Sequence, residues 1–146
     1  MLRSEADPAL TDVAGDHAAA AVWRAPGKWQ TTRLTMLRLA LPMLVAFGSA
    51  LPRALRLQAL LEAHHPSEPH WYLEFLGCNP AQQGQGYGGA ATRARLDHCD
   101  REQLPAALET ATAGNVPLYG ALGFAVTSEF DVPGGPHFWS LWREPR

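Results

Sequence analysis

The chain has 146 residues, of which 47% are hydrophobic and 18% are charged, and its formal net charge is −2 at pH 7. This length suffices for one hydrophobic core without a supporting disulfide or metal, and the composition is that of a folded domain. The weak negative charge provides no basic field for nucleic acid, and Cys78 and Cys99 lack the spacing of metal ligands. We therefore expect one domain over residues 1–146, no nucleic-acid partner, no bound metal, and a reducing, cytoplasmic location.

The N-terminal half predicts two strands followed by two helices. A strand over 16–23 lies between turn residues and can pair with residues 10–13 as a hairpin. Thr31 and Thr32 can cap a helix, and apolar residues then recur at helical spacing in two segments that Gly48 separates. These segments predict two consecutive helices.

The most apolar stretch, 34–50, bears on membrane association. It is shorter than the roughly 20 residues that a transmembrane helix needs, and Arg38 and Pro42 interrupt it. The first ten residues carry acids and a proline where a signal peptide would be apolar. We therefore expect a buried helix here, no membrane partner and no export signal.

The C-terminal half alternates strands with helices. A strand expected over 71–78 precedes a helix over 88–102 and a short strand over 106–109. Asn115 can start a short helix that stops at Gly123. Two final strands, over 124–132 and 138–142, flank a Pro-Gly-Gly-Pro turn.

A glycine-rich turn lies between the strand over 71–78 and the helix that follows it. The segment Gln83–Gly89 contains four glycines within six residues. Glycine permits a positive φ and a close approach of the backbone to a ligand, and N–H groups at a helix N-terminus can bind phosphate. The turn lacks both the Lys-Ser/Thr ending of a P-loop and the acidic partner of a Rossmann site. The residues alone leave open a phosphate cradle or a tight loop.

Two motifs in order resemble those of a known family. Gln-x-x-Gly-x-Gly over 83–88, after a strand, resembles the acetyl-CoA signature of the GNAT superfamily of N-acetyltransferases. Asn-Val-Pro-Leu-Tyr-Gly-Ala-Leu-Gly-Phe over 115–124 resembles the C-terminal motif of that superfamily, with Leu-Glu-Thr before it at 108–110. Three further segments are similar to the subgroup that contains puromycin N-acetyltransferase: 21–23, 69–73 and 129–133.

The resemblance covers roughly residues 17–145 and implies an α/β (α+β) fold, with a GNAT-like mixed central β-sheet flanked by helices. It implies that strands 71–78 and 106–109 are parallel neighbours that splay apart beyond Leu76. Family members usually begin with a strand and two helices before the strand found here at 18–23. The resemblance therefore implies a shortened N-terminus, with residues 1–16 as a short remnant.

The resemblance also implies acetyl-CoA as co-substrate. Backbone N–H groups of the turn would take the pyrophosphate, and the strand before it would pair with the pantetheine arm. The implied cofactor-binding residues are Leu76, Gly77, Cys78, Gln83, Gly84, Gln85, Gly86, Tyr87, Gly88, Gly89 and Asn115. Asn115 has the alternative role of a simple helix cap.

Three residues are candidates for proton transfer. The family places its general acid, near the CoA sulfur, at the position of Tyr119, which could instead be a packed core tyrosine. Glu74 can face the acceptor if the strand has a break in its pleat, and Glu109 on the adjacent strand is the rival general base. Cys78 shows no His–Asp pairing that would make it a nucleophile.

The implied function is acetyl transfer to a primary amine of a small molecule by direct attack in a ternary complex. A non-catalytic acyl-CoA-binding module or truncated inactive acetyltransferase is the second hypothesis, and a phosphate-binding domain without CoA specificity is the third. The acceptor and the oligomeric state stay open, with a homodimer possible.

Overall fold

The computed structural model describes residues 9–28 and 33–146, which form one six-stranded sheet with the order β1-β2-β3-β4-β6-β5. Strands β3 and β4 are parallel, and the other neighbouring pairs are antiparallel. In chain order the elements are β1 (Ala9–Ala14), β2 (Ala19–Arg24), α1 (Arg33–Phe47), α2 (Leu51–His64), β3 (Trp71–Cys78), α3 (Tyr87–Glu102), β4 (Ala106–Thr110), α4 (Val116–Ala121), β5 (Ala125–Asp131) and β6 (His137–Arg143). The predicted mixed sheet flanked by helices is confirmed.

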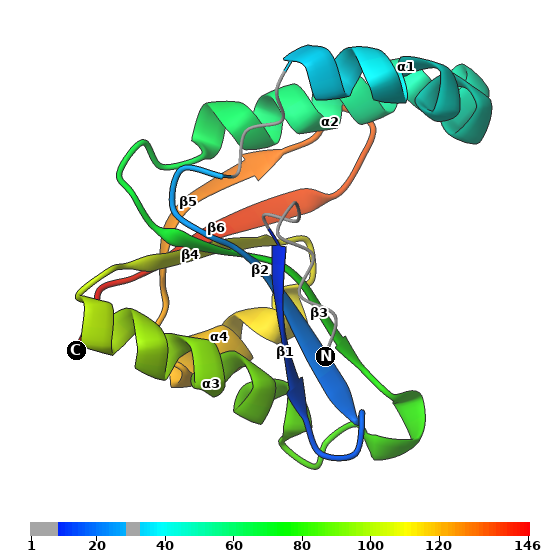
Figure 1. Cartoon of the computed structure of the whole chain (residues 1–146). Helices are drawn as coiled ribbons and strands as arrows, with labels where there is room; N and C mark the ends of the chain where they lie inside the picture. The colour runs from blue at the N-terminus through cyan, green and yellow to red at the C-terminus, as the bar shows by residue number, and fades with distance from the viewer. Residues whose placement is uncertain (1–8, 29–32) are drawn as a thin grey trace.

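The main core lies between the sheet and helices α3 and α4, while α1 and α2 lie on the other side (Figure 1). Trp71 and Leu108 face this core from the sheet, and Leu96 and Cys99 face it from α3. The buried face of α3 also contains small residues such as Gly89, Ala91 and Thr92. These small side chains let the helix pack closely even though its apolar face is narrow.

The predicted hairpin between the first two strands is confirmed, with Leu10 opposite Trp23. The second strand begins at Ala19 and not at residue 16. Gly15 and His17 have φ values of +65° and +59°, which place them in the turn between the strands. The predicted caps Thr31 and Thr32 lie outside the described residues.

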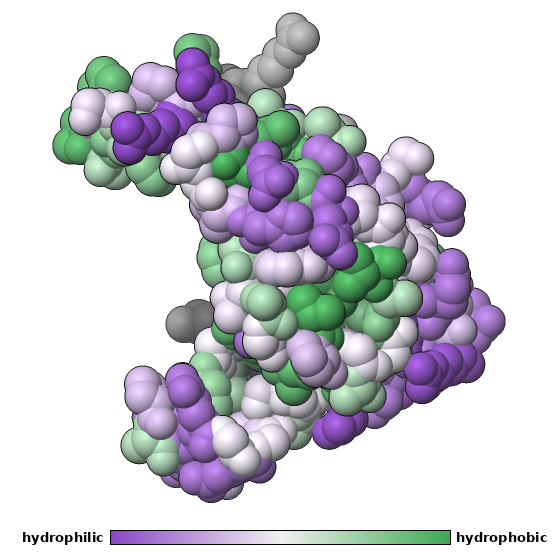
Figure 2. Space-filling view, turned by 180° about the vertical axis from the view of Figure 1, so that it is seen from behind, coloured by the Kyte–Doolittle hydropathy of each residue, from purple (hydrophilic) through white to green (hydrophobic). Residues whose placement is uncertain are grey.

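The prediction that the apolar stretch 34–50 is a buried helix is wrong. Helix α1 forms, but Leu37, Leu41 and Val45 are 74%, 70% and 80% exposed. At Gly48, where φ is +49°, the chain turns into α2, and the connected ends of the two helices project beyond the sheet (Figures 1 and 2). By length and composition the stretch Leu37–His64 is apolar enough to cross a membrane, and none of it is buried. The absence of a membrane partner therefore stays a prediction.

Strands β3 and β4 separate earlier than predicted. They pair only at Trp71 with Ala106 and at Tyr72 with Ala107, so the splay begins after Tyr72 and not beyond Leu76. A β-bulge lies on the other edge of β3, where Val22 pairs with Phe75 but Trp23 pairs with Leu73. A bulge bends its strand and increases the local twist, which accounts for the early separation.

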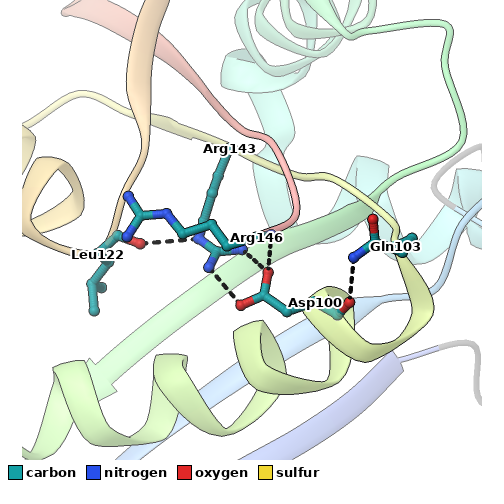
Figure 3. A network of polar contacts seen from close by, with 5 residues as sticks. All are labelled: Asp100, Gln103, Leu122, Arg143 and Arg146. Carbon is teal, nitrogen blue, oxygen red and sulfur yellow. Dashed lines mark hydrogen bonds and ion pairs between the residues drawn. The ribbon is translucent and has the colours of Figure 1, made fainter.

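A buried arginine ties the end of the sheet to both helices of the core side. The Arg143 guanidinium donates hydrogen bonds of 2.7 and 2.8 Å to the carboxylate of Asp100 in α3 (Figure 3). Its Nε donates to the carbonyl of Leu122, just after α4. The backbone N–H of Arg146 also donates to Asp100. Arg143 therefore fixes α3 and α4 relative to β6.

Candidate functional site

The glycine-rich turn presents unpaired donors at the start of α3. Gly84 and Gly86 have φ values of +77° and +84°, a region that favours glycine. Helix α3 begins at Tyr87 with no side-chain cap, and the first bond onto Gly86 comes from Ala90 N–H. The N–H groups of residues 87–89 thus precede the intrahelical ladder and can bind an anion.

A cavity of about 570 Å³ opens beside this turn. Its lining residues come from β3, the turn, α3 and α4: Leu76, Cys78, Gln83, Gly84, Gly86, Tyr87, Gly88, Asn115, Leu118 and Tyr119. Most of the residues predicted to bind the cofactor are therefore brought together. Gly77, Gln85 and Gly89 do not line the cavity, and Gly89 is buried in the helix face.

Tyr119 and Asn115 enter this cavity from the α4 side. The Tyr119 ring packs edge-on against Phe124 at 6.1 Å, and burial raises the pKa of its hydroxyl. It thus has the packing expected of a core tyrosine and also lines the cavity. Asn115 is the N-cap residue of α4, but its side chain makes no capping bond. The residue also lines the cavity, so both of its predicted roles stay open.

A second cavity, of about 260 Å³, lies on the α2 side of the sheet. Tyr72 and Glu74 alternate along β3 with Trp71 and Leu73, which face the α3 core, so they point the other way. The lining residues are Arg24, Gln58, Leu61, Glu62, His65, Tyr72 and Glu74. The two cavities therefore lie against opposite faces of β3, near the gap between β3 and β4.

Glu74 lines the second cavity, and the bulge at this point of β3 puts Leu76 and Cys78 on the opposite face, against the first cavity. The Glu74 carboxylate accepts two hydrogen bonds from Arg24, of 2.6 Å from Nη2 and 2.9 Å from Nε. Both groups are partly buried, with side-chain exposures of 23% and 26%. A bidentate pair of this kind holds the carboxylate in place.

Glu109 points to the same side from β4 and is almost fully enclosed, with 3% of its side chain exposed. Tyr72 and His65 lie beside it, with His65 Nδ1 4.0 Å from its Oε1. Burial raises the pKa of Glu109, and its interaction with the Tyr72 hydroxyl partly offsets this. Burial and the neighbouring His70 lower the pKa of His65 to about 4.

Several residues of these cavities were not predicted. Tyr72, His65 and Arg24 approach one another only through strand pairing and the end of α2, which no local motif records. Arg93 lines neither cavity, but it lies against the start of α3, where a Cβ built on Gly89 would be 3.6 Å from its Nη1. Its spacing of four residues from Gly89 on one helix face was the available signal.

Among the residues that the structure describes, no group of three or more His, Cys, Asp or Glu side chains could hold a metal ion. Cys78 and Cys99 are both free thiols. Cys78 lines the larger cavity, whereas Cys99 is completely buried.

Known proteins resemble this chain in sequence and in fold. An uncharacterized N-acetyltransferase of Schizosaccharomyces pombe is 37% identical over 54 residues, which are 37% of this chain and 22% of that protein. The chain thus matches about a fifth of the length of this curated relative.

Among solved structures, a histone acetyltransferase HPA2 and related acetyltransferase of Corynebacterium glutamicum aligns with a TM-score of 0.65 at 19% identity, over 99% of this chain and 68% of that one. A chain of the NatC complex bound to Gag peptide and CoA aligns with a TM-score of 0.54 at 13% identity, over 88% of this chain and 62% of its own. At these identities the likeness shows the shared fold.

A family model matches the part of the chain that contains the glycine turn and all of the cavity residues except Arg24. The acetyltransferase (GNAT) family model matches residues 43–124, which is more than half of the chain. This range includes α2, the glycine turn and Tyr119. The chain therefore belongs to the acetyltransferase (GNAT) family of acyltransferase enzymes.

Proposed function

We propose that the chain transfers an acetyl group from acetyl-CoA to a primary amine of a small molecule, by direct attack within a ternary complex. The observation that carries this proposal is the pair of cavities against opposite faces of β3, beside the gap between β3 and β4. Two reactants entering from opposite sides would meet at this gap. Holding them together there would supply much of the rate enhancement.

The larger cavity fits the cofactor. The open N–H groups of residues 87–89 and the nearby Arg93 suit the pyrophosphate, and a Cβ on Gly84 or Gly86 would meet no other atom within 4 Å. The edge of β3 that faces the gap has no strand partner beyond Tyr72 in the described sheet, so it can pair with the pantetheine arm. When bound, the thioester supplies the activated acetyl group.

Tyr119 is suited to protonate the departing thiolate. It lines the cofactor cavity, and burial keeps its hydroxyl in the protonated form. A phenol that keeps its proton at neutral pH can donate it to a developing thiolate.

The smaller cavity fits a small cationic acceptor. Its volume of about 260 Å³ lies just below the usual range of roughly 300–1,000 Å³ for ligand pockets. Among the described residues that line it, Glu62 and Glu74 are acidic and Arg24 is the one arginine or lysine. The excess negative charge attracts an ammonium group. The peptide named with the NatC complex makes a peptide N-terminus the competing acceptor.

Of the two candidate bases, Glu109 is favoured over Glu74. Taking a proton on Glu74 would break its bidentate pair with Arg24. Glu109 has a raised pKa, and its Oε2 has no hydrogen-bond partner among the described residues. A carboxylate with a pKa nearer neutrality is the better matched base.

Two measurements on the full chain test the function. Calorimetric titration with acetyl-CoA should show binding, and inorganic phosphate as a control should not compete at equal concentration. Thiol release should then be measured with alkylamines, arylamines and a short peptide. Binding without thiol release from any amine would support the non-catalytic acyl-CoA-binding module instead. Turnover of the peptide but of no small amine would overturn the acceptor class. A homodimer and a cytoplasmic location stay predictions.

A further inference from the structure

Tyr72 lies at the junction between the acceptor cavity and the gap in the sheet. It is the last residue of β3 that pairs with β4, opposite Ala107. Its side chain lines the smaller cavity, so it can contact a bound acceptor. Its side chain shares the neighbour His65 with Glu109, at 4.9 Å between the two rings and 4.0 Å from His65 Nδ1 to Glu109 Oε1, and its hydroxyl interacts with the Glu109 carboxyl.

Glu109 itself does not line that cavity. Only 3% of its side chain is exposed, and the neighbouring aromatic rings of His65 and Tyr72 contact each other edge-on at 4.9 Å. A bound amine therefore cannot reach Glu109 directly in this arrangement. If Glu109 is the base, some group must connect it to the cavity.

We propose that the Tyr72 hydroxyl carries the proton from the acceptor amine to Glu109, an inference that rests on the proposed acetyltransferase function. The ammonium N–H bond breaks as its proton bonds to the Tyr72 oxygen. The phenolic proton of Tyr72 passes at the same time to the carboxylate of Glu109. The tyrosine is neutral before and after the step, the amine is left neutral, and Glu109 becomes a carboxylic acid.

The groups around Tyr72 require that its two proton transfers occur at the same time. The pKa of Tyr72 is raised well above its usual value by burial first and by Glu109 second, so a free phenolate is excluded at neutral pH. Burial lowers the pKa of both His65 and His70, so neither ring supplies a competing positive charge. The other charged or titratable groups facing this junction are Arg24, Glu62, His64 and Glu74.

The first test compares two acceptors at pH 7. An alkylamine with a pKa near 10 is almost fully protonated there and must lose a proton before it attacks. An arylamine is already neutral. Tyr72→Phe keeps the ring and removes only the hydroxyl, so it should lower kcat for the alkylamine by about 100-fold or more. Its kcat for the arylamine should stay within about threefold of the parent value.

Tyr119→Phe is the matched control, because protonation of the thiolate is needed with either acceptor. It should slow both reactions alike. Equal losses for both amines in Tyr72→Phe would show a structural role and overturn the proposal, as would a normal rate with the alkylamine. A parent protein that acetylates neither amine would instead overturn the proposed function.

The second test needs no turnover. The Tyr72 hydroxyl lowers the pKa of Glu109, so removing that hydroxyl should raise the pKa. Carbon NMR of the labelled Glu109 carboxyl in the acceptor-free protein should show a higher titration midpoint in Tyr72→Phe than in the parent. Glu109→Gln identifies the resonance. An unchanged midpoint would show that the two groups are not bonded and would overturn the proposal.

Discussion

Replacing Gly86 tests the cofactor cradle in a way that separates backbone strain from charge. The φ of +84° at this residue costs a side chain about 1–2 kcal/mol. Gly134, in the turn between β5 and β6, has a φ of +70° and equally open surroundings, but it lines neither cavity. Gly86→Ala and Gly134→Ala should therefore lose similar stability, and only substitutions at Gly86 should weaken the binding of acetyl-CoA.

Gly86→Asp adds a carboxylate beside the N–H groups that would hold the pyrophosphate. An acid at a helix N-terminus interacts favourably with the helix dipole, so the fold should not suffer more than in Gly86→Ala. Repulsion between the carboxylate and the phosphates should abolish binding.

Thermal unfolding with and without ligand measures both effects. Acetyl-CoA at about 100 times its Kd stabilises a protein by roughly 2.7 kcal/mol. At about 2–4 °C per kcal/mol this raises Tm by roughly 5–11 °C. The parent and Gly134→Ala should show this rise, and Gly86→Asp should show none. Normal stabilisation of Gly86→Asp by acetyl-CoA would refute the assignment of the cradle.

Three further outcomes follow from the same structure. Tyr119→Phe should lower kcat by about 100-fold or more, while the affinity for acetyl-CoA, measured by titration, stays unchanged. A variant that fails to fold would show that Tyr119 has a structural role in the core. Iodoacetamide should alkylate Cys78, which lines the cofactor cavity, and bound acetyl-CoA should slow this reaction. Cys99 should stay unmodified, because burial raises its pKa to about 12. Equal labelling of the two cysteines, measured by mass spectrometry, would contradict this. Arg143→Met should cost about 3 kcal/mol in urea unfolding at pH 7. Because Arg143 lowers the pKa of Asp100, this stabilisation is present at neutral pH and is lost as the pH falls through the lowered pKa. If Arg143→Met lowered the free energy of unfolding equally at pH 7 and below that pKa, this reasoning would be contradicted.

Local patterns sufficed for the elements whose signals are contained in one segment. The strand over 71–78 and the glycine turn were placed correctly, because a strand, a turn and a helix follow one another within about thirty residues. The hairpin and the short helix at 116–121 were recognised for the same reason.

Features that depend on register between distant segments could not be predicted. The approach of Tyr72 to Glu109 depends on which residues of two parallel strands are neighbours and which face they share. The pair of Arg24 and Glu74 joins residues 50 positions apart. The exposure of α1 likewise depends on where the turn at Gly48 directs the helix, which its apolar composition does not specify.

Within the described parts of the chain, β3 is the one element that contributes to both cavities. The remaining walls of the acceptor cavity come from β2 and the end of α2, before β3 in sequence, and those of the cofactor cavity come from the turn, α3 and α4, after it. Under the proposed function, the residues that select the acceptor and those that bind the cofactor therefore lie in two consecutive blocks of sequence. A chimaera that joins the segment before β3 of one relative to the segment after β3 of another should have the acceptor preference of the first and the cofactor-binding residues of the second.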